Sequence, residues 1–395
     1  MNLISTHPVR HLVIVCSNYP APWAPTNGTF VQQLVHAVAR QGVRCSVIHP
    51  VPIHEAIRQV RFHERETLDV GNGIVVEVFR PRYISVSARE GFAFMGRLSP
   101  SFVTLNRFTA AVRRVISHEG LKPDAIYGHF LYLSGAAAIR VGEELGIDAF
   151  PGVGEGEMWT VRQFGWEHAR RFLPKATAFI ANSTALKRIL VSELYLSSAL
   201  IEVFPNGTDL NSFYPRDRAI ARERFGLPKD QFLVGAVGNF LEKKGIVRVG
   251  QAIDGLEGVA GVFAGSGPVP PQASNTAFCG RVPHNQLPDL LSACDVFALP
   301  TVIEGSCNAL IEAMACGLPI ISSIGEFNDD VLDETMSIRI DPWDVSALRG
   351  AIMSLRDDPQ RRKAMADAAV RRSREFDVDQ RARRILNFMG ARLRG

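Results

Sequence analysis

Short apolar segments alternate with longer amphipathic segments along the whole chain of 395 residues, in two successive blocks. The segments expected to form strands are residues 11–17, 44–50, 73–79, 124–130, 176–183 and 201–205 in the first block, and 232–240, 259–267, 276–280, 295–300 and 318–323 in the second. The segments expected to form helices include residues 29–42, 104–120, 134–146, 244–256, 284–294 and 308–316. Because strands that alternate with helices build parallel sheets covered by helices, the chain is predicted to form two Rossmann-like α/β domains.

The length of the chain supports this division, since 395 residues exceed what one hydrophobic core usually holds. Residues 205–217, PNGTDLNSFYPRD, are rich in the Asn, Gly, Asp and Pro that are typical of a break between domains. We therefore expect an N-terminal domain over 1–205, a C-terminal domain over 206–375, and a terminal helix over 376–395 that packs back toward the first domain. Ligands of parallel sheets bind at the carboxyl ends of the strands. Two facing domains would thus hold the site in the cleft between them.

The composition is that of a globular protein, with 46% hydrophobic and 21% charged residues. The six cysteines have no CxxC or metal-ligand spacing, so buried free thiols in a reducing compartment are expected. The first residues lack the long apolar region of a secretory signal, and no apolar run reaches the length of roughly 18 to 20 residues that a membrane span needs. The sequence therefore predicts a cytoplasmic protein.

Positive charge is concentrated at the end of the chain. Residues 361–395 contain eleven Lys and Arg against four Asp and Glu, whereas the formal net charge of the whole chain is +4. A solvated face on terminal helices is one interpretation, and contact with an anionic membrane surface that holds a lipid-linked acceptor is another. No aromatic residues interleave these charges in the manner of a nucleic-acid site, so no nucleic-acid partner is expected.

Two carboxylates in the segment EGSCNALIE, Glu304 and Glu312, stand eight positions apart. A glycosidase needs its two acids about 5 to 10 Å apart, whereas eight helical residues would separate them by about 12 Å. The spacing therefore favours two anchors on one long ligand. The helix between them would offer free N–H groups and a positive dipole end to an anion. This order of groups fits a nucleotide sugar, although two surface acids flanking an ordinary helix would give the same pattern.

Three further segments carry glycine or lysine where a strand ends. Gly238 follows the first strand of the second block, and Lys244 then opens a helix, where its charge could hold a diphosphate or remain solvated. Gly265 ends the next strand and permits close approach of a ligand, or simply a tight turn. Gly28 and Thr29 lead into the first long helix and would present backbone N–H groups, unless they only cap that helix.

Taken together, these segments resemble the retaining glycosyltransferases of family 4, of the polysaccharide-biosynthesis group 1 type, which have the GT-B fold. The resemblance rests on NGTF, ANSTALKRIL, VFPNGTDLNSFYP, GNFLEKKG, AGSGP, FCGRVPHNQLPDLLSACDVFALPT and EGSCNALIEAMACGLPIISS. It is strong over roughly residues 180 to 325 and thinner before them. The E-x7-E element formed by Glu304 and Glu312 is its most specific part.

The resemblance implies roles for particular residues. Glu304 would lie beside the hydroxyls of the donor sugar, Glu312 would bind the ribose, and Lys244 would neutralise the diphosphate. The further donor contacts that it implies are Gly28, Thr29, Gly238, Asn239, Gly265, Arg281, Val282, Asn308, Ala309 and Leu310. It implies no bound metal or other cofactor, and no Asp-x-Asp accompanies the segments that carry it.

The chain departs from the family pattern at two places. Asn239 stands where an arginine is common, which removes one bidentate phosphate partner unless Lys243 or Arg281 substitutes. No histidine follows the strand near residue 150, where Glu155 and Glu157 are found instead and become candidates for the acceptor side. His129 ends an earlier strand and is a candidate either for ligand contact or for a hydrogen-bonded structural role.

We therefore expect transfer of a sugar from a nucleotide-diphosphate donor to a hydroxyl of a glycan or lipid-linked glycan, with retention. Lys244, Glu304 and His129 are the expected catalytic group, and the leaving phosphate itself would take the acceptor proton. Two other functions of the same fold are kept as alternatives. One is a sugar-nucleotide epimerase, and the other is a protein that binds nucleotide sugars without turnover.

Overall fold

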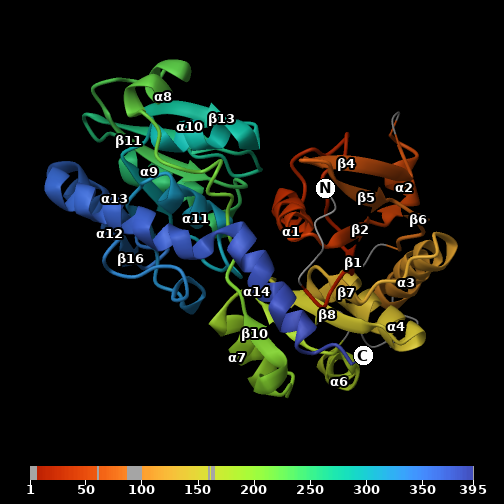
Figure 1. Ribbon diagram of the computed structural model, residues 1–395. Helices are drawn as coiled ribbons and strands as arrows, with labels where there is room; N and C mark the ends of the chain where they lie inside the picture. The colour runs from red at the N-terminus through yellow and green to blue at the C-terminus, as the bar shows by residue number, and fades with distance from the viewer. Residues whose placement is uncertain (1–6, 60–61, 87–99, 159–160, 162–164, 395) are drawn as a thin grey trace. The chain divides into compact units, whose positions relative to one another are not determined.

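The computed structural model describes residues 7–59, 62–86, 100–158, 161 and 165–394 (Figure 1). The chain divides into two compact units. The first contains Met1–Phe204 and Val378–Gly395, and the second contains Pro205–Asp377. Each unit is described by itself below.

The first unit is built on an eight-stranded sheet. Its strands, in spatial order, are β10 (Ile201–Val203), β9 (Phe179–Ala181), β8 (Asp148–Val153), β7 (Ala125–Gly128), β1 (His11–Val15), β2 (Arg44–Ile48), β5 (Ile74–Phe79) and β4 (Arg65–Gly71). All neighbours are parallel except β4 and β5. Two short strands, β3 (Val51–Pro52) and β6 (Arg82–Tyr83), form a separate parallel pair.

Helices cover both faces of this sheet. The principal ones are α1 (Thr29–Arg40), α2 (Ile53–Ala56), α3 (Pro100–His118), α4 (Ala136–Leu145), α6 (Trp166–Phe172), α7 (Thr184–Ser192) and α14 (Val378–Gly390). Successive residues of β1 point to opposite faces, so that Leu12 and Ile14 join the core under α1 and α14, while Val13 and Val15 join the core under α3 and α4. An ion pair of 2.7 Å between Arg40 and Asp379 links α1 to α14.

The second unit has a six-stranded sheet in which every neighbouring pair is parallel. The spatial order is β13 (Thr276–Gly280), β12 (Val259–Ala264), β11 (Phe232–Val237), β14 (Val296–Leu299), β15 (Ile320–Ser323) and β16 (Ser337–Ile340). The principal helices are α8 (Arg218–Arg224), α9 (Ile246–Ile253), α10 (Leu287–Ser292), α11 (Asn308–Ala315), α12 (Val345–Asp357) and α13 (Pro359–Ser373). A single cluster of buried apolar side chains joins the sheet to these helices.

The prediction of two α/β units with parallel sheets is confirmed by these two sheets. Strands β4 and β16 were not among the predicted elements. β4 is antiparallel to its neighbour, and its side chains alternate between exposed and half-buried positions, so it lacks the continuous apolar run of a central strand. β16 is shorter still, at four residues, and contains Ser337 and Arg339.

Two local expectations were wrong. Lys244 does not open a helix, because Glu242–Lys244 form a turn of 3-10 helix and Gly245, with φ of 76°, separates that turn from α9. The helical rise assumed between Glu304 and Glu312 was also wrong, because α11 begins at Asn308.

The expectation of buried thiols was wrong for Cys279, which is exposed on the edge strand β13, whereas the other five cysteines are buried as expected. Within the described residues no helix is long and apolar enough to cross a membrane.

Candidate functional site

The sheet of the second unit has a switch in strand order next to β11. From β11 the chain continues outward through β12 and β13 on one side, and through β14, β15 and β16 on the other. The loops after β11 and β14 therefore diverge at their carboxyl ends, which is where open α/β sheets bind ligands. The loop after β11 carries Lys244, and the loop after β14 carries Glu304.

Lys244 and Glu304 form an ion pair between their Nζ and Oε1 atoms. Backbone contacts hold the two loops together, since Lys243 O accepts hydrogen bonds from Val302 N at 2.8 Å and from Thr301 Oγ1 at 3.1 Å. Burial opposes the charge on Lys244, but Glu304 outweighs that effect, so the pKa of Lys244 is raised. The ammonium group is therefore fully charged at neutral pH and is half-buried between the two loops.

Arg248 reinforces the loop that carries Lys244. Its side chain is buried and donates to Glu242 O at 2.9 Å and to Pro300 O at 3.0 Å, which again joins the loop after β11 to the end of β14. The guanidinium also lies 4.3 Å from the centre of the Trp343 ring. Gly245 is required here, because its φ is positive and a Cβ would collide with Pro300 O.

The N-terminus of α11 lies directly after Glu304. Its N-cap residue, Cys307, makes no side-chain capping bond, and the backbone N–H groups of Ala309 and Leu310 face its sulfur. The buried Oδ1 of Asn308 has no hydrogen-bond partner among the described residues. A helix start of this kind offers N–H groups and a positive dipole end to an anion.

Asn206 holds the segment that enters α11. Its backbone N–H donates to Ser306 Oγ at 3.1 Å, and its side-chain amide donates to Ser306 O at 2.9 Å. Asn206 lies 100 residues from Ser306 in the sequence. In the sequence Asn206 belongs to the expected break between the domains, and it was not among the expected site residues.

Glu312 lies inside α11 and is 5% exposed. Its Oε1 is 3.0 Å from Nε2 of His284, which precedes α10. Burial lowers the pKa of His284, but the bond and charge of Glu312 raise it more, so the net pKa is above the ordinary histidine value. His284 lies in one of the segments that resemble the family, but the expected donor contacts in that segment were only Arg281 and Val282. One signal in the sequence pointed to a role of His284 at the site, because this histidine lies close to the end of an expected strand, β13.

The glycine turns after β11 and β12 pack against each other. A Cβ on Gly265 would collide with the carbonyl oxygen of Gly238, so contact between the two turns accounts for this glycine without a ligand. Arg281 is exposed and donates from Nε to Ser266 Oγ at 2.7 Å, while Asn239 is exposed and carries no guanidinium. Contact between the two turns therefore accounts for the glycine at position 265, and its expected contact with the donor stays a prediction.

The first unit has its own switch in strand order, between β1 and β7. Gly28 lies after β1 with φ of 72° at the N-cap of α1, which begins at Thr29, and a Cβ on Gly28 would lie 2.5 Å from Asn18 O. His129 follows β7, and its ring lies 5.4 Å from the ring of Phe30 in α1. The two predicted segments are thus neighbours in the fold.

His129 is held by hydrogen bonds and aromatic packing. Its Nδ1 is 3.0 Å from the hydroxyl of Tyr127, and its backbone N–H donates to Val15 O at 2.8 Å. Burial, and then the charge of Arg381 on α14, lower the pKa of His129 to about 3. The imidazole is therefore neutral at physiological pH.

Glu155 binds the backbone turn that follows His129. Its Oε1 accepts from Leu131 N at 2.5 Å and from Tyr132 N at 3.4 Å, and its Oε2 accepts from Gly154 N at 3.0 Å. Burial raises the pKa of Glu155, and these backbone donors oppose that rise. Glu157, two residues further on, is exposed. The sequence suggested Glu155 and Glu157 equally as candidates for the acceptor side, but the carboxylate of Glu155 is bound by backbone N–H groups whereas Glu157 is exposed.

No group of three or more His, Cys, Asp or Glu side chains is arranged to hold a metal ion within the described part of the chain. One Asp-x-Asp does occur, at Asp377 and Asp379, outside the segments named above. Asp379 is paired with Arg40 there.

The two halves of the chain match two family models. The model described as Glycosyltransferase Family 4 matches residues 28–212, and the model described as Glycosyl transferases group 1 matches residues 217–372. TuaC of Bacillus subtilis (strain 168), which is named as a glycosyltransferase of teichuronic acid biosynthesis, is 28% identical over 383 residues, with 91% of this chain and 88% of TuaC covered.

Solved structures of low sequence identity share the whole fold. Sucrose-phosphate synthase from Thermosynechococcus elongatus has a TM-score of 0.75 at 20% identity, covering 96% of this chain and 98% of that one. HepE from Anabaena, solved in complex with UDP, has a TM-score of 0.69 at 19% identity, covering 97% and 100%. The fold that these structures share with the chain, with two parallel-sheet units, is the GT-B fold. The chain belongs to the group 1, family 4 glycosyltransferases, and it is an enzyme of that class.

Proposed function

We propose that this enzyme transfers a sugar from a nucleotide-diphosphate donor to a hydroxyl of a glycan or lipid-linked glycan, with retention of configuration at the sugar. The observation that carries the proposal is the Lys244–Glu304 ion pair, which lies at the strand-order switch beside the N-terminus of α11. A cation, a helix N-terminus and a carboxylate are the groups that a diphosphate and a sugar hydroxyl require. Structures of HepE with UDP and with UDP-glucose, which have the same fold, support a donor of this class.

In this proposal each group of the second unit contacts one part of the donor. Glu312, held by His284, accepts hydrogen bonds from the ribose hydroxyls, and Glu304 accepts from hydroxyls of the sugar. Lys244 and the first N–H groups of α11 bind the diphosphate. When the bond to the sugar breaks, the leaving diphosphate gains negative charge, so these donors stabilise the transition state more than the ground state.

We assign the acceptor proton to the leaving phosphate, because His129 and Glu155 are poorly suited to take it. His129 has a pKa of about 3, which makes it a weak base, and the oxygens of Glu155 already accept backbone hydrogen bonds. Both residues then serve to shape the acceptor side. Charge on the diphosphate is balanced by Lys244 and the helix amides, so the proposal includes no bound metal. Treatment with EDTA should leave the rate unchanged, and a rate restored by added Mg²⁺ or Mn²⁺ would contradict this part.

The first experiment is a thermal-shift screen of UDP-, GDP- and ADP-sugars, because a bound donor raises the unfolding temperature by mass action. Release of nucleoside diphosphate is then measured for the donor that binds, with and without a panel of glycan and lipid-linked glycan acceptors. Release that depends on an acceptor, together with a product of retained configuration, supports the proposal. Release or inversion without an acceptor would instead indicate a sugar-nucleotide epimerase. Tight donor binding without any turnover would indicate a binding protein.

A further inference from the structure

The chain folds back on itself directly after β7, beside the candidate acceptor residue His129. Residues 129–135 connect the end of β7 at Gly128 to the start of α4. The two ends of this connection touch, because a Cβ on Gly128 would lie 2.5 Å from Cα of Gly135. Within the connection, Gly135 N donates to Phe130 O at 2.8 Å. The chain therefore reverses its direction within a very short distance.

This tight reversal places two residues that carry side chains in unfavourable backbone conformations. Phe130 has φ of 70° and ψ of 148°, and Leu133 has φ of 52° and ψ of −70°. Both combinations are rare for residues other than glycine, and each costs free energy that the surrounding structure must supply. Strain of this kind is concentrated at functional sites. The 130–133 turn is therefore a candidate for a role in binding.

The carboxylate of Glu155 holds the 130–133 turn. Its Oε1 accepts hydrogen bonds from the N–H groups of Leu131 and Tyr132, which lie between the two strained residues, and its Oε2 accepts from Gly154 N. Hydrogen bonds to an ionised acceptor are roughly twice as strong as those between neutral groups. Glu155 follows β8, which neighbours β7 in the sheet. One charged side chain thus joins the carboxyl ends of two adjacent strands.

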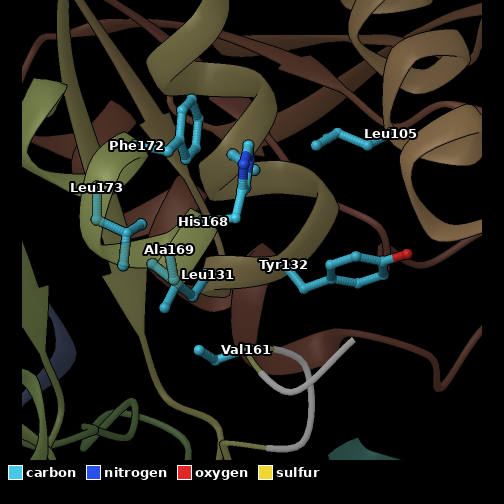
Figure 2. Close-up of a pocket in the computed structure, with 9 residues that line it drawn as sticks. Leu105, Leu131, Tyr132, Val161, His168, Ala169, Phe172 and Leu173 are labelled. Atoms are coloured by element: carbon cyan, nitrogen blue, oxygen red, sulfur yellow. The ribbon is translucent and has the colours of Figure 1, made fainter. Parts of the chain in front are cut away.

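The side chains of the two residues that donate to Glu155 are anchored in different places. Leu131 packs with Ala169 and Leu173 in one apolar cluster, whereas the ring of Tyr132 points away from Ala169 (Figure 2). Both residues line a small apolar cavity beside α3 and α6 (Figure 2). The packing of Leu131 therefore fixes one side of the turn, and Glu155 fixes its backbone.

The turn sets the position of aromatic rings at the carboxyl end of β7. The ring of Phe130 lies 4.6 Å from that of His129 and 5.9 Å from that of Phe30, in the first turn of α1. Phe130 and His129 are both half-buried, so part of each residue faces solvent. Phe30 follows Gly28 and Thr29, which are expected donor contacts. A change of φ at Phe130 would move its ring relative to both neighbours.

We propose that Glu155 is a positioning residue for sugar transfer, because it holds the 130–133 turn in its strained conformation and the turn places the rings of His129 and Phe130 against the acceptor. This assignment rests on the proposed function, since it concerns the acceptor side of the same reaction. Glu155 itself makes no contact with the reacting atoms in this proposal. A misplacement of about 1 Å can cost about 100-fold in rate, so loss of the carboxylate bonds should impair use of the acceptor.

The strain allows a specific rescue experiment. Glycine adopts positive φ without strain, so Leu133→Gly removes part of the strain that Glu155 must balance. Glu155→Gln replaces one accepting oxygen by an amide group, and it should raise KM for a p-nitrophenyl glycoside acceptor at least tenfold. In the Leu133→Gly background the same change should raise this KM less than threefold. Equal effects in the two backgrounds would overturn the proposal.

The matched background for this rescue is Tyr195→Gly. Tyr195 also has a positive φ, of 56°, but it is exposed after α7 and makes no bond to Glu155. The tenfold effect of Glu155→Gln should therefore remain in this background. A rescue by Tyr195→Gly as large as that by Leu133→Gly would show a general effect of glycine and would overturn the proposal.

Two further measurements distinguish positioning from general damage to the fold. The dissociation constant of the nucleotide sugar selected by thermal shift should change less than twofold in Glu155→Gln, because Lys244, Glu304 and Glu312 belong to the second unit. Amide hydrogen exchange over residues 129–135 should accelerate at least tenfold, whereas exchange in β1 should stay unchanged. Glu193→Gln, at an exposed glutamate of the same unit, is the control and should alter none of these values. Equal weakening of donor and acceptor, or unchanged exchange over 129–135, would overturn the proposal.

The unmodified chain answers the question if Glu155→Gln fails to fold. Exchange over residues 129–135 should slow at least threefold when nucleoside diphosphate and the accepting p-nitrophenyl glycoside are added together, and the absence of any slowing would overturn the proposal. A chain that transfers no sugar to any acceptor would refute the proposed function and the acceptor role with it, although accelerated exchange in Glu155→Gln would still assign the hold on the turn to Glu155. A chain that transfers sugar, but whose KM for the acceptor is unchanged in Glu155→Gln, would refute the positioning role alone.

Discussion

Removal of the ammonium group by Lys244→Ala tests whether the ion pair serves catalysis or only the fold. The side chain of Glu304 is 16% exposed and that of Lys244 is 23% exposed. Loss of one partner of a fully buried ion pair costs about 3 to 5 kcal/mol. Partial exposure lets water solvate the remaining carboxylate, so we expect the free energy of unfolding to fall by about 1 to 3 kcal/mol. For a unit of this size, that loss of stability corresponds to a fall in unfolding temperature of about 2 to 12 °C.

The expected effect on turnover is larger. In the proposed mechanism Lys244 faces the charge that develops on the leaving diphosphate, and removal of one such donor typically costs about 100- to 1000-fold in kcat. The assay measures acceptor-dependent release of nucleoside diphosphate, at a temperature where the variant is folded by calorimetry. Lys229→Ala, which removes an exposed ammonium from the same unit, is the matched control and should retain the original rate.

The double variant Lys244→Ala/Glu304→Gln separates the two roles. It leaves no unpaired carboxylate, so most of the lost stability should return, whereas kcat should stay at least 100-fold below the unmodified enzyme. A Lys244→Ala enzyme with unchanged kcat, or a double variant that regains its rate along with its stability, would refute the reasoning.

Three further predictions concern the groups around this pair. The raised pKa of His284 means that its bond to Glu312 contributes stability below the unfolded-state value of about 6.5, and that this contribution disappears as the pH rises through the folded pKa. His284→Gln should remove this dependence and raise KM for the donor about tenfold, as seen in melts and kinetics between pH 5 and 9. His129, with a pKa of about 3, should show no imidazole titration by NMR between pH 4 and 8. Its contribution to the stability of the fold should fall as the pH drops from 6.5 towards 3. A titration of His129 near pH 6.5 would contradict its burial. Asn206→Ala should loosen Ser306 and raise KM for the donor severalfold with kcat nearly unchanged, and an equal loss in both parameters would argue against a positioning role.

Three glycines of the two units show which backbone features are visible in the local sequence and which are not. Gly28 and Gly245 both have positive φ values, which agrees with glycine at a tight turn. The carbonyl oxygens that leave no room for a side chain are distant in the sequence, since Gly245 meets Pro300 O, 55 positions later, and Gly265 meets Gly238 O, 27 positions earlier. A contact of that kind has no signature in the residues next to either glycine.

The alternation of apolar and amphipathic segments by itself determined the two α/β units, because strand and helix periods depend on residues two to four positions apart. The spacing of Glu304 and Glu312, and the position of Lys244 after a strand, also predicted these three residues as part of the site. Only the tertiary structure decided which groups meet, since Lys244 pairs with Glu304 across 60 residues, His284 with Glu312 across 28 and Asn206 with Ser306 across 100. The physical reason is that strand order, and not sequence order, sets which loops emerge side by side at the carboxyl edge of a parallel sheet.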